Sequence, residues 1–271
     1  MSESRAVKDP TMEMVKVEGP GAEVFLQGIV SQDVTALEAD NARRSFLLGP
    51  QGKLRALLWM TRDGDRFHLF THRGLGEQLK NDLTYYKIRV KAEIADPVPV
   101  WQLIGTGEGA SAPLGEDIRL LTTTEPADAE AMSIEEWTAL RIEAGEPVMG
   151  IDVDTNTIPL ETGLVEESVS FTKGCYLGQE LLARLESRGG RVNRHLRGLH
   201  LKGPSLVPTP VLLEGEEVGA LSSVAWSKRW ASHLGLALLK RKVEPGATVV
   251  VGGVAAEVLE LPLSPGLRPA R

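Results

Sequence analysis

The segment Lys173-Gly174-Cys175-Tyr176-Leu177-Gly178-Gln179-Glu180 contains the single cysteine of the chain, next to a glycine and close to a lysine. A helix-forming stretch from Glu180 to Leu185 follows directly. A glycine beside a thiol at a helix start permits close backbone approach, while free N–H groups and a nearby ammonium favour the thiolate. The segment therefore predicts a reactive thiol or a turn that faces a ligand. The alternative is a cysteine that packs as a small buried hydrophobe.

The composition is that of a globular protein. The 271 residues are 42% hydrophobic and 25% charged, which argues against long disorder and predicts two or three domains. The net charge of −7 excludes a general attraction to nucleic acid or anionic membranes, so any such contact needs a local patch. One cysteine cannot form an internal disulfide, and neither a signal peptide nor a membrane-length apolar run is present. We therefore expect a cytoplasmic protein without membrane contact.

The pattern of apolar residues predicts an α+β protein that ends in a small barrel or sandwich. Residues 12–17 alternate between apolar and polar, and Asp63-Gly64-Asp65 is a hairpin signal. Leu75, Leu79 and Leu83 mark one face of a helix. After residue 195, short apolar runs alternate with turns, which is typical of a small all-β domain.

A second candidate site is Glu143, in the run Arg141-Ile142-Glu143-Ala144-Gly145. It ends a helix that we expect to begin with the cap Ser133. A carboxylate there could accept two hydrogen bonds from a guanidine-like or aminopyrimidine edge. The alternative is a solvated carboxylate at a helix end, paired with Arg141.

The third candidate is a positive patch. Five arginines lie within fourteen residues: Arg184, Arg188, Arg191, Arg194 and Arg197. They could hold a phosphate backbone or a polycarboxylate tail, or they could belong to a solvated linker. We expect no metal site, because the cysteine count is too low for a structural zinc or iron–sulfur centre. Asp152 and Asp154 are interpreted as turn residues.

The octapeptide at 173–180 resembles the signature of the YgfZ family, folate-binding relatives of the glycine-cleavage T-protein that support iron–sulfur enzymes. The runs 141–145, 149–152 and 158–161 resemble the "R-x-E-A-G … G-x-D … P-x-E" track that both branches share. Weaker similarities in the N-terminal half and the C-terminal part extend the resemblance over nearly the whole chain.

The resemblance implies an α+β cloverleaf of three domains around a central hole that binds tetrahydrofolate or a one-carbon-substituted folate. The implied domains are residues 1–45 with 130–192, residues 46–129, and a C-terminal β-barrel at 193–271. Glu143 would face the pterin, and Lys173 and Cys175 would border the hole as the catalytic pair. The other implied cofactor contacts are Gly174, Tyr176, Gln179, Glu180 and Arg184.

The implied function is an accessory protein that supports assembly or repair of iron–sulfur enzymes, including those that thiolate tRNA. Cys175 would be its functional thiol, and no classical turnover is expected. A folate-dependent aminomethyl- or methyltransferase is the first alternative, disfavoured because the run 51–56 lacks the carboxylate that such enzymes carry there. The second alternative is an RNA-binding module that contacts tRNA through Arg188, Arg191 and Arg194.

Overall fold

The computed structural model describes residues 4–263, and this part of the chain forms two compact units. The first unit contains the residues up to Ala112, Ile118–Ala131 and Leu164–Arg188. The second contains Pro113–Asp117, Met132–Gly163 and the residues from Gly189 onward. The boundaries of the three predicted domains stay a prediction.

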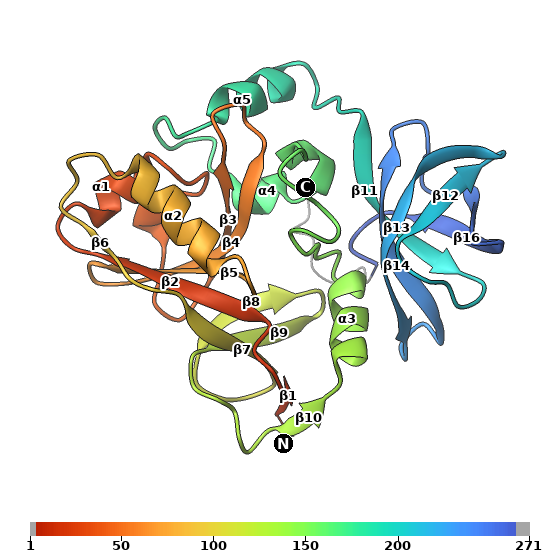
Figure 1. The fold of residues 1–271 in the computed structure, drawn as a ribbon, viewed down its shortest axis with the longest axis horizontal. Helices are drawn as coiled ribbons and strands as arrows, with labels where there is room; N and C mark the ends of the chain where they lie inside the picture. The colour runs from red at the N-terminus through yellow and green to blue at the C-terminus, as the bar shows by residue number, and fades with distance from the viewer. Residues whose placement is uncertain (1–3, 264–271) are drawn as a thin grey trace. The chain divides into compact units, whose positions relative to one another are not determined.

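A ten-stranded sheet lies mainly in the first unit, in the order β10-β1-β7-β2-β5-β4-β3, with β6 on β2 and the β8–β9 pair on β7 (Figure 1). Its strands are β1 (Arg5–Val7), β2 (Met12–Glu18), β3 (Arg43–Leu48), β4 (Leu54–Asp63), β5 (Arg66–His72), β6 (Glu93–Ile94), β7 (Val98–Ile104), β8 (Ala110–Leu114), β9 (Asp117–Thr122) and β10 (Glu130–Met132). The helices of this unit are α1 (Ala22–Gln27), the 3₁₀ turn η1 (Val34–Ala36), α2 (Gly76–Tyr86), α4 (Val165–Ser168) and α5 (Gln179–Ser187).

Both faces of this sheet are buried. On one face, Phe67 and Leu69 of β5 pack with Leu79 and Leu83 of α2. On the other face, Phe70 packs in a separate cluster with Trp59. The predicted helical face and the predicted hairpin are therefore confirmed, and Gly64 adopts the left-handed backbone (φ +65°) that the turn between β4 and β5 needs.

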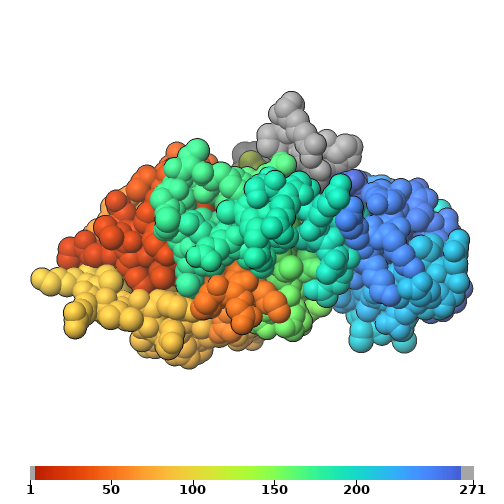
Figure 2. Space-filling model, turned by 90° about the horizontal axis from the view of Figure 1, so that it is seen from above, coloured from red at the N-terminus to blue at the C-terminus, as the bar shows by residue number. Residues whose placement is uncertain are grey.

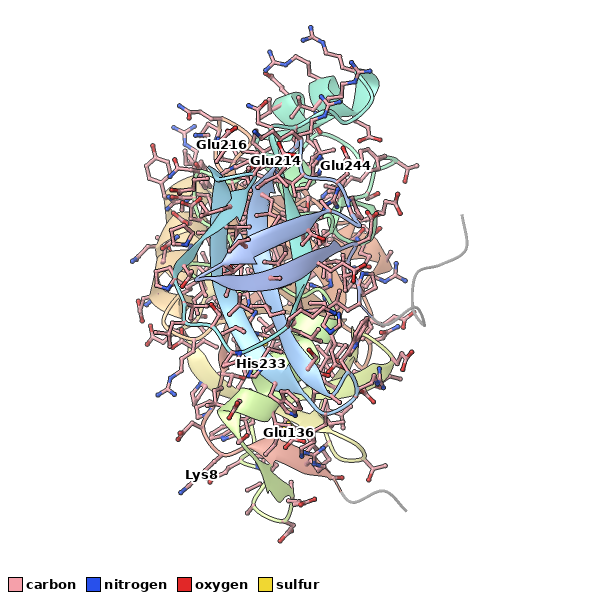
Figure 3. All side chains as sticks on the ribbon, turned by 90° about the vertical axis from the view of Figure 1, so that its right-hand side faces the viewer. Lys8, Glu136, Glu214, Glu216, His233 and Glu244 are labelled. Carbon is pink, nitrogen blue, oxygen red and sulfur yellow. The ribbon has the colours of Figure 1, made fainter. Side chains whose placement is uncertain are left out.

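The second unit contains a closed six-stranded barrel in the order β11-β14-β13-β12-β15-β16. Its strands are β11 (Arg194–Leu201), β12 (Thr209–Leu213), β13 (Glu216–Ser227), β14 (Ser232–Lys240), β15 (Thr248–Val251) and β16 (Val254–Leu259). Alternate apolar residues such as Leu199, Leu201, Val249 and Val251 fill its interior. Figure 3 shows Glu214, Glu216 and Glu244 at one end of the barrel and His233 toward the other. The α+β class and the C-terminal barrel are thus confirmed.

Helix α3 (Ile134–Glu143) packs on strand β13 within the second unit, followed by the 3₁₀ turn η2 (Pro159–Thr162). The predicted cap is present, since Ser133 Oγ accepts a hydrogen bond from the backbone N–H of Glu136. Gly145, with φ +69°, ends the helix. The cap and the glycine fix where Glu143 lies, in the last turn.

Candidate functional site

Lys173 anchors the predicted motif to the first unit. Its ammonium donates to the backbone carbonyls of Val30 and Gln32, at 2.7 and 2.8 Å. The nitrogen also lies 5.3 Å from the ring centroid of Tyr176. Burial lowers the pKa of Lys173 to about 8, while the charge of Asp33 acts in the opposite direction. The lysine therefore holds the turn in place, and its predicted effect on the thiol stays a prediction.

Gly178 is the glycine on which the close backbone approach depends. It has φ +76°, and a Cβ at this position would lie 2.4 Å from the carbonyl oxygen of Gly49. Gly52, in the turn that joins β3 and β4, is similarly crowded, because its Cβ would lie 2.6 Å from Cβ of Leu181. Gly174, by contrast, has open space around it. The start of α5 and the Gly49–Gly52 turn therefore pack backbone against backbone.

Cys175 is exposed, so the alternative of a buried structural cysteine is wrong. The helix that follows begins at Gln179, with Gly178 as its N-cap. The thiol therefore lies in the turn before the helix and not in its first turn. An exposed thiol can reach a macromolecular partner or a small sulfur species without any opening of the core.

The remaining residues of the predicted motif lie on the same turn and on α5. Tyr176 is half-buried, and burial raises the pKa of its hydroxyl to about 12. Its backbone N–H donates to Oε1 of Gln179, which closes the turn. Gly174, Glu180 and Arg184 are exposed. The structure thus brings these residues together in the first unit, and their predicted contact with a cofactor stays a prediction.

Glu143 belongs to the second unit and is only 6% exposed, so the solvated alternative is wrong. Its Oε1 accepts a hydrogen bond of 2.6 Å from the hydroxyl of Ser227. That hydroxyl also accepts from the backbone N–H of Trp230, which fixes its direction. Oε2 lies 3.9 Å from Nη1 of Arg229, beyond hydrogen-bond distance. Nη1 of Arg229 lies closer, at 2.7 Å, to Oε2 of Glu116.

This arrangement suits an aminopyrimidine ligand. A carboxylate offers about four lone-pair sites, and Ser227 uses one of them. Oε2 can therefore accept a hydrogen bond from an N–H donor. The hydrogen bond from Ser227 to Oε1 sets the orientation of the carboxylate. The sequence pattern did not identify Ser227, because it lies 84 residues from Glu143 at the end of a barrel strand.

The partner of Arg141 is Asp152 and not Glu143, which corrects the alternative in which Arg141 pairs with Glu143. Nη1 of Arg141 donates to Oδ2 of Asp152 at 2.8 Å, and both side chains are buried. Oδ1 of Asp152 accepts from the hydroxyls of Ser222 and Ser223. Adjacent residues of a regular strand point to opposite faces, but a bulge in β13 between Leu221 and Ser223 lets both serines reach one carboxylate. Asp152 lies in a turn, as expected, since its backbone N–H donates to the carbonyl of Val148, and its side chain is in addition a buried anchor.

Asp154 is a turn residue, as expected. Its Oδ1 accepts from the backbone N–H of Asn156 and from the hydroxyl of Thr157. Within residues 4–263, no group of three or more His, Cys, Asp or Glu side chains is arranged to hold a metal ion.

The predicted arginine patch is divided by the fold. Arg194 forms a bidentate pair with the buried Glu161, at 3.0 and 2.9 Å, and Arg197 lies 3.5 Å from Glu260. The exposed members are Arg184, Arg188 and Arg191. Arg184 and Arg188 belong to the first unit and Arg191 to the second.

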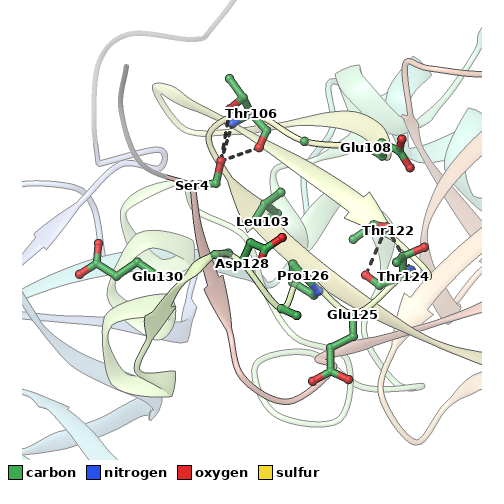
Figure 4. Close-up of a pocket in the computed structure, with 13 residues that line it drawn as sticks. Ser4, Leu103, Thr106, Glu108, Thr122, Thr124, Glu125, Pro126, Asp128 and Glu130 are labelled. Atoms are coloured by element: carbon green, nitrogen blue, oxygen red, sulfur yellow. Dashed lines mark hydrogen bonds between the residues drawn. The ribbon is translucent and has the colours of Figure 1, made fainter.

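A cavity of about 600 Å³ lies in the first unit, apart from the predicted motif (Figure 4). Its lining includes Glu108, Glu125, Asp128 and Glu130, and Ser4 at its edge bonds to Thr106. The residues that line it include none of the predicted site residues. In the part of the chain that the structure describes, no helix is long and apolar enough to cross a membrane.

No protein-family model matches the chain, but known proteins resemble it in sequence and in fold. The tRNA-modifying protein YgfZ of Shigella dysenteriae is 28% identical over 276 aligned positions, which cover 88% of this chain and 81% of that protein, and YgfZ of Escherichia coli gives the same values. A candidate transferase of the Arabidopsis thaliana chloroplast is 37% identical over 127 residues, which are 45% of this chain and only 29% of the plant protein.

The glycine-cleavage aminomethyltransferase T of Bartonella henselae has the same fold, with a TM-score of 0.81 at 19% identity over 96% of this chain and 86% of that one. This likeness confirms the T-protein-like fold that the sequence predicts. In sequence, the chain is similar to the YgfZ proteins over most of its length, in agreement with the resemblance carried by the octapeptide.

Proposed function

We propose that this protein binds tetrahydrofolate, or a one-carbon-substituted folate, and supports the assembly or repair of iron–sulfur enzymes, including those that thiolate tRNA. The observation that carries the proposal is Glu143, a buried carboxylate with one oxygen fixed by Ser227 and the other available to a donor. The T-protein-like fold and the tRNA-modifying relatives support it. The cytoplasmic location, expected from the single cysteine, is part of the same proposal.

Glu143 would recognise the pterin through its aminopyrimidine edge, which presents adjacent N–H donors to a carboxylate. Ser227 holds that carboxylate in one orientation, so little side-chain freedom is lost on binding. When bound, the folate supplies a carrier for a one-carbon unit. Gly174, Tyr176, Gln179, Glu180 and Arg184 are proposed as further contacts.

Cys175 is proposed to bind a sulfur species or an iron–sulfur cluster fragment that passes between this protein and a client enzyme. Its exposure permits direct contact with such a partner. Lys173 is proposed to favour the thiolate, because an ammonium near a thiol stabilises the negative charge. This role requires no turnover of the folate.

Calorimetric titration with tetrahydrofolate under anaerobic conditions tests the ligand and its site together. Glu143→Gln keeps the shape of the side chain but removes its charge, and we expect at least about tenfold weaker binding, since a hydrogen bond to a charged group is worth about 1.5–3 kcal/mol. Glu136→Gln is the matched control, because Glu136 lies in the first turn of the same helix and pairs with Lys228. Equal affinity of Glu143→Gln and the parent chain would show that the pterin is not recognised here.

A folate-dependent one-carbon transferase is the second candidate, favoured by the aminomethyltransferase fold. The run Gln51–Ala56 contains no carboxylate to remove a proton from an attacking amine, which weighs against it. Transfer of a one-carbon unit between formaldehyde and tetrahydrofolate, followed spectrophotometrically with the purified protein, distinguishes the two. A rate above the uncatalysed reaction supports the transferase.

Direct contact with tRNA is a third candidate. Arg188 and Arg191 are exposed and retain the proposed role. Arg194 already donates two hydrogen bonds to the carboxylate of Glu161. It would have to break them before it could bind a phosphate.

A further inference from the structure

The end of α2 and the segment that follows it form a cationic projection on an acidic protein. The eight residues Tyr85–Ala92 include Lys87, Arg89 and Lys91 and no acidic residue, whereas the whole chain has a net charge of −7. In Figure 2, the yellow atoms of the chain after α2 project from the left edge of the first unit. Local positive charge of this kind can attract an anion that the protein as a whole repels.

Two apolar side chains on this segment are exposed to an unusual degree. Tyr85 and Ile88 are each 75% exposed. The ring of Tyr85 meets the ring of Tyr86 edge to face, with centroids 5.0 Å apart. An aromatic ring that is supported at its edge and exposed to solvent is suited to stack with a planar group from a partner.

The backbone of the segment is held in place by contacts inside the first unit. The N–H of Gly21 donates to the carbonyl of Lys91 at 3.0 Å, and Nζ of Lys87 donates to the carbonyl of Ala92 at 2.8 Å. Arg89 adopts a left-handed backbone, with φ +58°. The cationic groups are therefore presented from a fixed turn, which reduces the entropy lost when a partner binds.

The charges of Arg89 and Lys91 are not neutralised within the described residues, where neither side chain has an ion-pair partner. Neighbouring cations are paired: Arg55 with Asp82, and Lys80 with Asp96. Arg194 and Arg197 of the arginine patch are paired as well. Unpaired cations beside an exposed aromatic ring complement a polyanion that carries planar bases.

We propose that Tyr85, Ile88, Arg89 and Lys91, here called the α2 tip, bind unpaired nucleotides of an RNA. Arg89 and Lys91 contact phosphates, and Tyr85 and Ile88 contact the faces of unstacked bases. This goes beyond folate binding and does not depend on Glu143. It also differs from the arginine patch in position and in its use of base stacking.

Fluorescence anisotropy with end-labelled bulk tRNA, over a series of salt concentrations, tests the α2 tip. For the double variant Arg89→Asn with Lys91→Gln we expect about tenfold weaker binding. The slope of the logarithm of the binding constant against the logarithm of the salt concentration should fall in magnitude by about two. Asn is chosen at position 89 because it tolerates a left-handed backbone. For Tyr85→Ala we expect a loss of about fivefold or more with little change in slope, since stacking is not a charge effect.

The charge-matched control is Lys8→Gln with Lys202→Gln, which removes two exposed lysines from other surfaces. Arg188→Gln with Arg191→Gln tests the competing patch. Unchanged tRNA affinity of the tip variants overturns the proposal. It is also overturned if labelled polyglutamate binds as tightly as tRNA and if Tyr85→Ala leaves that polyglutamate affinity unchanged. Tetrahydrofolate calorimetry on the tip variants should match the parent chain, so failure here is distinguishable from failure of the folate proposal.

Discussion

Arg141 of α3 and Asp152 form a buried ion pair of 2.8 Å, to which Ser222 and Ser223 of the bulged strand β13 add hydrogen bonds. Two residues farther along α3, Glu143 bonds to Ser227 of the same strand. The last turn of the helix is thus joined to β13 at two points. The orientation of the proposed pterin-binding carboxylate follows from this double attachment.

Replacing Asp152 by alanine should lower the free energy of unfolding by about 3–5 kcal/mol, because Arg141 would remain buried without its counter-charge. Urea denaturation followed by circular dichroism measures this. Glu216→Gln is the control, since Glu216 forms exposed ion pairs with Lys240 and Lys242, and we expect no measurable change there. A loss below about 1 kcal/mol for Asp152→Ala would show that the pair is not an anchor.

Gly178→Ala should destabilise the chain by about 1–3 kcal/mol, since it forces alanine into a left-handed backbone and against the carbonyl of Gly49. Gly174→Ala is the matched control in the same octapeptide, with no atom within 4 Å of its new Cβ, and should stay within about 0.5 kcal/mol of the parent. Thermal and urea unfolding of the two variants give the comparison. Equal stability of both would disprove the close packing at the start of α5.

Lys173 should titrate near pH 8 in the folded chain, against its ordinary value of 10.5, because burial disfavours the ammonium and lowers its pKa. The unfolded chain then binds more protons between these values, so the contribution of Lys173 to the free energy of unfolding should rise with pH across this window. Reductive ¹³C-methylation and an NMR titration locate the midpoint, with Lys173→Met assigning the resonance. The difference in unfolding free energy between parent and Lys173→Met, measured at both ends of the window, checks the sign. A midpoint at or above the ordinary value contradicts the prediction.

Cys175 should react with Ellman's reagent in the folded protein at one thiol per chain, because it is the single cysteine and is exposed. Cys175→Ser should fold, and bind tetrahydrofolate, as the parent chain does. In cells it should fail to replace the parent chain in supporting iron–sulfur enzymes. Full complementation by the serine variant would contradict the proposed role of the thiol. It would not contradict the proposal that the protein binds folate.

Local features of the fold followed from the sequence because short-range rules determine them. The Ser133 cap depends on a backbone group three residues away, and the β4–β5 hairpin on a glycine at its turn. The alternation of Met12–Glu18 and the helical spacing of Leu79 and Leu83 depend on periodicity alone. The octapeptide pointed to the family that the chain resembles, since its eight residues are distinctive even without a structure.

The amino-acid sequence by itself determined the class of the fold, the barrel at its C-terminal end and the family that the chain resembles. Only the tertiary structure decided that Asp152 pairs with Arg141, that Ser227 orients Glu143 and that Arg194 pairs with Glu161. The physical reason is sequence separation. The groups that meet Glu143 and Arg141 from strand β13 lie 84 and 82 residues away, so their contacts form only when the barrel closes and packs against α3.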